Sequence, residues 1–487
     1  MRIFGPNTDI RLLLLALLLG VTAGYAQAPG GDSAAPAGHS VSAPVLAPLF
    51  TLFTGNSKGP SEDGEATAAD NAVLSGAQNL SPDVNISKRS YWQPFFDLTA
   101  TLDTNPLGVG STINLAPWGS FYGGTDLHWT SHRSDLSVNY LGGAVVSQYK
   151  GGDAPLQQLS LGEKLSWRHA TISLFDQFGY FPEAVSEFFL PTDPERAVNQ
   201  ETSLQPIFLP NESIVTTAGQ ELANSFIGEL DVTATPRSSF TFLESYSIVR
   251  FFNTGLLDPS DTTLQAGFNH QITRSDTLAL LYRFVAFRFS NLYQPMDGHV
   301  VQLAWGRRVR GRLAFQLSAG PELGLLSTAG PAPAAGAAPT INTFRHLYWT
   351  ADGSMTYEIR RTVLKLGYDR GVTDGAGFLR GAITDQVYGS LDGQLSRTLR
   401  GELIGGYARN QGLLATTQQP ANAVYGDWFA GVTISHALSR RASIFFSYQL
   451  QRQVSNFVCA GVVCGNDFMR HLISVGVTGR SQPRPIG

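Results

Sequence analysis

The sequence predicts an all-β fold, a transmembrane up-and-down antiparallel β-barrel of about 18 strands, with 16 as the alternative. Three observations favour this class. Segments that alternate apolar and polar residues recur from Tyr91 to the end of the chain, and short and long connections alternate between them. Charged residues make up only 15% of the chain, against about 25% in an ordinary soluble domain. No stretch approaches the roughly 18 apolar residues that a membrane-spanning helix needs.

The first 26 residues are predicted to be an export signal. An apolar run from Leu12 to Leu19 follows a weakly basic start, and small residues surround Ala26, after which we place the cleavage site. Cleavage after Ala28 would also satisfy the small-residue rule, but it leaves Pro29 at the new terminus. A membrane anchor is the alternative, and the apolar run is too short for it.

Residues 27–90 are rich in Ala, Pro, Gly, Ser, Asn and Asp and show no sustained period, which predicts a flexible periplasmic extension. The segment Pro44–Phe53 is an apolar island within it. It either docks on another surface or forms a transient cluster in a disordered tail. The barrel itself is predicted to occupy residues 91–487.

The strands are read from strict period-two alternation. Phe96, Leu98, Ala100 and Leu102, for example, alternate with polar residues over eight positions. About 18 such strands are predicted, near residues 95, 119, 134, 156, 170, 222, 238, 262, 276, 297, 312, 346, 362, 379, 399, 424, 441 and 468. One strand plus its connection then averages about 22 residues, the spacing expected for tilted strands of about 10 residues with turns.

The connections between these strands fall into two sets. Eight are tight turns, near residues 131–134, 168–169, 236–239, 274–276, 308–310, 360–361, 396–400 and 439–441. Nine longer loops lie between them, and the longest runs from about Phe181 to Glu221. In outer-membrane barrels the short turns are periplasmic and the long loops extracellular. Eight turns and nine loops therefore predict 18 strands with both termini in the periplasm.

Three segments carry a family resemblance: Tyr368–Phe378, Phe240–Phe252 and the end of the chain, Arg470–Ile486. In these the chain resembles an uncharacterised family of Gram-negative outer-membrane β-barrel proteins. The resemblance spans roughly residues 91–487 and implies the barrel and its location in the outer membrane. It brings no catalytic residues with it.

Catalytic and nucleic-acid-binding functions find little support. The chain has no nucleophile elbow, zinc-protease motif, CxxC pair or Lys-containing phosphate loop, and its nine His are scattered. A net charge of −4 provides no basic field for nucleic acid. We therefore predict no enzyme activity, no cofactor and no metal.

Cys459 and Cys464 lie in the loop before the last strand. Exported chains are oxidised, so we predict a local disulfide between them. Closing so short a loop should contribute about 2 kcal/mol by the chain-entropy model.

The polar side of the predicted strands defines a candidate lumen that is modestly acidic. It comprises Asp97, Asp103, Lys164, Glu229, Asp231, Arg283, Glu322, Asp352, Lys365, Asp369 and Glu402. Glu163 and Glu244 instead fall on the apolar side of their strands, where a carboxylate facing lipid is costly. Either a β-bulge shifts the phase there or the assumed register is wrong.

The loop from Phe181 to Glu221 is predicted to narrow the barrel mouth, because it holds two similar apolar knots, at 188–191 and 207–210. Its candidate constriction residues are Glu183, Glu187, Phe188, Phe189, Asp193, Glu195, Glu201, Phe208 and Glu212. The equally weighted alternative is a lid in which the knots pack against neighbouring loops.

These features predict a passive, porin-like channel for small hydrophilic solutes. The alternative is a structural or export component of the outer membrane, such as an exit for a surface polysaccharide. The expected partners are outer-membrane lipid, the barrel-assembly machinery and small solutes.

Overall fold

The computed structural model describes most of the predicted barrel. The described residues are 90–106, 113–147, 154–181, 221–252, 257–273, 275–290, 292–309, 312–329, 341–359, 361–375, 379–414, 423–456 and 467–486. In this part of the chain, no helix is long and apolar enough to cross a membrane. The signal peptide, residues 27–89 of the extension, the loop at 182–220 and both cysteines lie outside the described residues.

Eighteen long strands and one short one form in the described residues. They are β1 (Tyr91–Asp103), β2 (Ala116–Thr130), β3 (Ser134–Ser147), β4 (Ala154–Ser166), β5 (Ala170–Phe181), β6 (Glu221–Thr235), β7 (Ser238–Phe251), β8 (Pro259–Gln271), β9 (Asp276–Phe289), β10 (Leu292–Val309), β11 (Leu313–Ala329), β12 (Ile341–Ile359), β13 (Thr362–Thr373), β14 (Arg380–Gln394), β15 (Leu399–Leu414), β16 (Val424–Ala437), β17 (Ala442–Ser455), β18 (Phe468–Arg480) and β19 (Arg484–Pro485).

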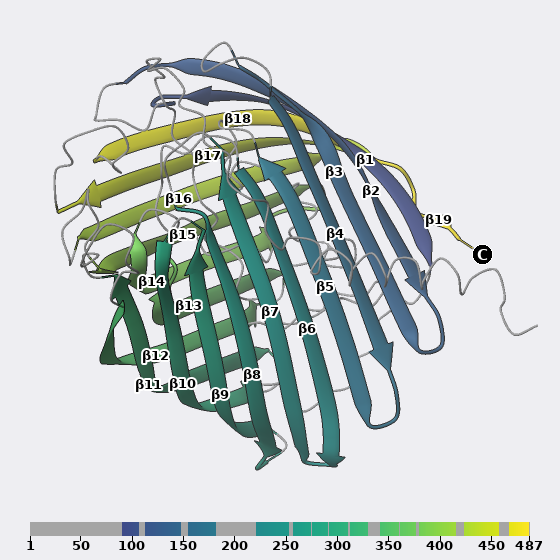
Figure 1. Ribbon diagram of the computed structural model, residues 1–487. Helices are drawn as coiled ribbons and strands as arrows, with labels where there is room; N and C mark the ends of the chain where they lie inside the picture. The colour runs from purple at the N-terminus through teal and green to yellow at the C-terminus, as the bar shows by residue number, and fades with distance from the viewer. Residues whose placement is uncertain are drawn as a thin grey trace, which may run out of the picture. The chain divides into compact units, whose positions relative to one another are not determined.

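The long strands close into a barrel (Figure 1). Each pairs antiparallel with its neighbour in sequence, and β18 returns to pair with β1 over nine residues, from Phe95↔Arg480 to Asp103↔Leu472. β19 extends this seam by pairing with Tyr91 and Trp92. The prediction of an all-β, up-and-down barrel with 18 strands is therefore confirmed, and the alternative of 16 strands is wrong.

Both described ends of the chain lie at the end of the barrel with the short turns. The Ser90 hydroxyl donates a hydrogen bond to the carbonyl of Thr130, which directly precedes the first short turn (3.3 Å). The Ile486 amide donates to the carbonyl of Ser90 (3.2 Å). This end corresponds to the periplasmic side of known outer-membrane barrels. The periplasmic position of the termini stays a prediction.

The outer surface of the barrel is apolar. Large hydrophobic side chains stand exposed on one side of nearly every strand, for example Leu98 (49%), Leu303 (62%) and Val475 (55%). In water such a continuous apolar surface would drive aggregation. On a closed barrel, which leaves no unpaired strand edge, it is the band that contacts lipid.

The structure corrects the expectation for Glu163 and Glu244. Pairing runs without a shift through both positions, Leu136↔Glu163↔Leu174 and Gly228↔Glu244↔Leu264. No bulge changes the phase there, and the register read from the sequence holds, so both carboxylates lie on the outer side. Glu163 is three residues from the short-turn end of β4 and accepts a hydrogen bond from the Ser134 hydroxyl (3.0 Å). Glu244 lies in the middle of β7 and is exposed.

Replacing Glu244 with Leu should stabilise the barrel by up to about 2 kcal/mol in lipid, because a charged group at mid-depth on the lipid face is unfavourable. Glu163→Leu is the matched control. Its carboxylate is near the rim and hydrogen-bonded, so the same change should give no gain. Urea unfolding of both variants in vesicles measures the difference, and an equal gain at both sites would contradict the depth argument.

Candidate pore lining

The inner side of the barrel wall is the polar side of the strands. On β1, Asp97 (6% exposed) and Thr99 alternate with the exposed Phe96 and Leu98. The amide of Gln302 on β10 donates to Asp352 on β12, across β11, at 2.7 Å. In a curved sheet, side chains of next-but-one strands approach so closely only on the concave face. The buried polar side therefore faces inward.

The register places every candidate lumen residue on this inner side. Asp97, Asp103, Lys164, Glu229, Asp231, Arg283, Glu322, Asp352, Lys365, Asp369 and Glu402 all share a face with the polar positions defined above. Their action on a permeating solute stays a prediction.

Further inward acidic residues were not predicted from the sequence: Asp126, Asp135, Asp261, Asp392 and Asp427. Glycines interrupt the alternation beside two of them, at Gly123 and Gly124 before Asp126 and at Gly426 before Asp427. A glycine has no polar or apolar side chain, so the alternation near it does not show whether Asp126 or Asp427 faces inward. The cross-strand hydrogen bond from Asn139 to Asp126 shows the face that the pattern hid.

One group of inward acidic side chains lies on β11, β12 and β13 and comprises Glu322, Asp352 and Asp369. Asp352 and Asp369 are paired positions. The Ser318 hydroxyl donates to Asp352 (2.8 Å), and Arg283 on β9 interacts electrostatically with all three acidic residues. The single guanidinium of Arg283 is therefore shared by three acidic side chains.

A second group, nearer the short turns, is balanced. Lys365 and Arg400 interact with Asp392 and Glu402 on neighbouring strands. Asp392 and Glu402 are a registered pair between β14 and β15.

The wall formed by β1 to β8 is mainly acidic. Its inward charged residues include Asp97, Asp126, Glu229, Asp231 and Asp261, against Lys164. Hydroxyl donors fix some of these carboxylates, as in Thr241 to Asp231 (2.6 Å) and Thr99 to Asp97 (2.7 Å). The inner wall therefore presents more acidic than basic groups, held in fixed positions by neighbouring strands.

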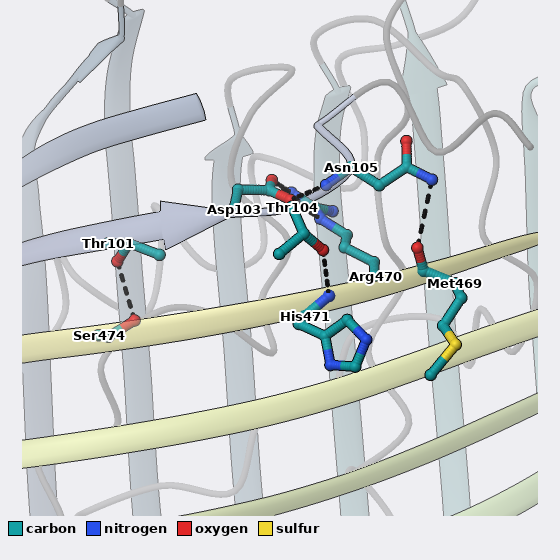
Figure 2. A network of polar contacts seen from close by, with 8 residues as sticks. All are labelled: Thr101, Asp103, Thr104, Asn105, Met469, Arg470, His471 and Ser474. Carbon is teal, nitrogen blue, oxygen red and sulfur yellow. Dashed lines mark hydrogen bonds and ion pairs between the residues drawn. The ribbon is translucent and has the colours of Figure 1, made fainter. Parts of the chain in front are cut away.

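The seam between β1 and β18 carries an inward network of its own (Figure 2). Arg470 donates from Nε to both oxygens of Asp103, at 3.0 and 2.9 Å, and also from Nη2. Asn105 donates its backbone amide to Asp103 (2.9 Å) and its side-chain amide to the Met469 carbonyl (3.2 Å). The predicted lumen residue Asp103 is therefore held by a bidentate pair that joins the first and last strands at their long-loop end.

The remaining candidate residues lie outside the described residues. These are the constriction-loop residues Glu183, Glu187, Phe188, Phe189, Asp193, Glu195, Glu201, Phe208 and Glu212, and the pair Cys459 and Cys464. Among the residues that are described, no group of three or more His, Cys, Asp or Glu side chains is arranged to hold a metal ion.

Comparisons with known proteins give fold-level likeness only. No protein-family model and no curated protein matches the chain, so the family resemblance has no support of that kind. Among solved structures, it is similar to the ferric citrate transporter FecA, at 10% identity and a TM-score of 0.41, over 76% of this chain. The chain spans 61% of the length of that transporter.

Two Pseudomonas aeruginosa proteins are covered almost completely. OpdQ matches at 10% identity and a TM-score of 0.39, over 82% of this chain and 98% of its own. OccK2, in complex with glucuronate, matches at 11% and 0.41, over 81% and 98%. The strand pairing, the closure and the apolar exterior make this chain an 18-stranded β-barrel of the Gram-negative outer membrane.

Proposed function

We propose that the protein is a porin-like channel through which small hydrophilic solutes diffuse, with a preference for cations. The observation that supports it is the closed ring of 18 strands with an inner wall whose charged residues are mostly acidic. A ring of this size encloses more space than its own wall side chains fill. Fixed carboxylates along a low-dielectric throat attract cations and repel anions.

The loop from Phe181 to Glu221 narrows the mouth in this proposal. Its two apolar knots, at 188–191 and 207–210, would pack on the wall and leave the carboxylates between and around them facing water. A loop of this length that is fully exposed to water is expected to be polar, so its two aromatic segments favour packing against the barrel. These carboxylates add to the acidic wall below.

Single-channel recording in planar bilayers tests the proposal, with the full chain compared with a deletion of residues 186–211. A larger and less cation-selective conductance after the deletion is expected if the loop is a constriction. A closed wild-type barrel that opens on deletion would indicate a lid. If both chains fold, as judged by heat-modifiable mobility, and neither conducts, the channel proposal fails.

A structural or export role is the second candidate, and one observation favours it. Several inner-wall side chains have no exposure to water at all, among them His128, Thr241 and Asn269. Water does not reach the wall at these positions. A barrel with a filled interior would serve as a scaffold, or would open only when a partner or a polymer engages it.

A further inference from the structure

Two arginines share one carboxylate on the outside of the barrel. Asp385 on β14 forms an ion pair with Arg370 on β13 and lies 3.9 Å from Nη1 of Arg409 on β15. The Tyr368 hydroxyl also donates to Asp385 (3.2 Å). These three charged residues are called the Asp385 cluster below.

The Asp385 cluster faces the lipid side. Arg370, Asp385 and Arg409 form one registered row across three strands. Each lies on the same side of its strand as an exposed aliphatic residue, namely Leu366, Val387 and Leu403. The cost of a charged group on this surface falls from mid-depth toward the edges.

The cluster lies toward the long-loop end, among aromatic residues. Arg370 is three residues before the end of β13, and Arg409 is five before the end of β15. Cζ of Arg370 stands 4.2 Å from the ring centroid of Trp349, and Tyr407 packs on Trp428 at 4.2 Å. Exposed Trp and Tyr on a barrel mark the level of the lipid headgroups.

The cluster has unused donors and an excess positive charge. Two guanidinium groups carry ten N–H donors between them, since each has five, and one carboxylate cannot engage them all. Two positive charges against one negative charge leave a net +1. Other outer ion pairs near this end, Arg250 with Asp258 and Arg288 with Asp297, are balanced one to one.

Small residues flank the row and leave access to it. Ala351 pairs with Arg370 on one side, and Gly426 pairs with Arg409 on the other. A Cβ at Gly426 would be in ordinary van der Waals contact, 3.4 Å from Oη of Tyr407 and from Cγ2 of Val454. The Arg409 side chain is itself 42% exposed, so an anionic group can reach it from the lipid side.

We propose that the Asp385 cluster binds a phosphate of a lipid A-type glycolipid in the outer leaflet. Guanidinium groups hold phosphate oxygens bidentately, and the two that share Asp385 keep N–H donors that one carboxylate does not engage. At headgroup level on the side of the long loops, the phosphates of the outer leaflet are the anions within reach. This inference concerns the outer surface and is independent of the proposed channel.

The test uses the folded full chain in detergent and native mass spectrometry with bis-phosphorylated lipid A. Arg370→Gln with Arg409→Gln should weaken binding by about tenfold or more, because two charged donors are lost. Arg288→Gln, an exposed arginine of a balanced pair, is the matched control and should leave binding unchanged. Asp385→Asn should retain or tighten it. If the double variant does not fold, Arg409→Gln alone, at the more exposed position, replaces it. This single variant should lose about threefold in affinity for lipid A.

Three ligand arms complete the design. Without its phosphates, lipid A should bind weakly to the wild-type protein. Its binding should be no stronger than that of bis-phosphorylated lipid A to the double variant. Equal binding of phosphatidylglycerol would assign the cluster to any phospholipid and overturn the proposal. If millimolar inorganic phosphate binds the cluster without a lipid and displaces lipid A, the cluster is a site for the free anion, and the proposal is likewise overturned. Unchanged lipid A binding in the double variant would also overturn it.

Discussion

Replacing Arg470 with Gln is expected to destabilise the barrel by about 3–5 kcal/mol, the usual consequence of removing one partner of a buried ion pair. The side chains of Arg470 and Asp103 are only 5% and 1% exposed. Without the guanidinium, Asp103 keeps the Asn105 amide as a donor but loses its counter-charge. The seam is also the one junction of the barrel whose two strands are far apart in sequence.

Urea unfolding of the folded barrel in detergent, followed by heat-modifiable mobility on gels, measures this loss. Arg288→Gln is the control, because Arg288 and Asp297 are exposed at 48% and 30% and such pairs contribute about 0–1 kcal/mol. Arg470→Gln combined with Asp103→Asn should recover most of the stability, since no unpaired charge remains. Equal effects of Arg470→Gln and Arg288→Gln would show that the seam pair is not special.

Removing two acidic groups from the inner wall is expected to reduce cation preference. Glu229→Gln with Asp231→Asn changes charge on β6 while an amide oxygen can still accept the Thr241 hydrogen bond. A unit charge about 6 Å from an ion in water interacts with it by about 0.7 kcal/mol, roughly threefold in occupancy. The reversal potential in a KCl gradient should therefore move toward zero, most clearly at low salt.

The control for this experiment lies on the next strand. Glu244→Gln removes one acidic group beside Gly228, but its carboxylate points outward, so selectivity should not change. If Glu244→Gln shifts the reversal potential as much as the inner pair does, the effect is a general one of net charge. If the inner pair has no effect in a conducting barrel, β6 does not line the ion path.

The strand count and the in–out phase could be predicted because they depend on local patterns. Leu98 and Asp97 differ in side because successive residues of a strand point to opposite faces. The phase at Glu244 also followed from the sequence, and only the assumption that a lipid face excludes carboxylates led to the wrong suggestion of a bulge. Where glycines interrupt the alternation, as before Asp126 and Asp427, the pattern did not reveal the inward residue.

The side-chain groupings depend on register between strands, which the sequence does not display. Arg370, Asp385 and Arg409 lie on three consecutive strands, and they meet because the registers of two hairpins align them in one row. Asp103 was predicted as a lumen residue, yet its partner Arg470 comes from the other end of the chain, 367 residues away.

The sequence by itself determined the fold class, the number of strands and the polar side of most of them, because period-two alternation and turn chemistry are local properties of the chain. Only the tertiary structure decided which charges share a site, because closure through β1 and β18 and the stagger between strands are set by pairing over hundreds of residues.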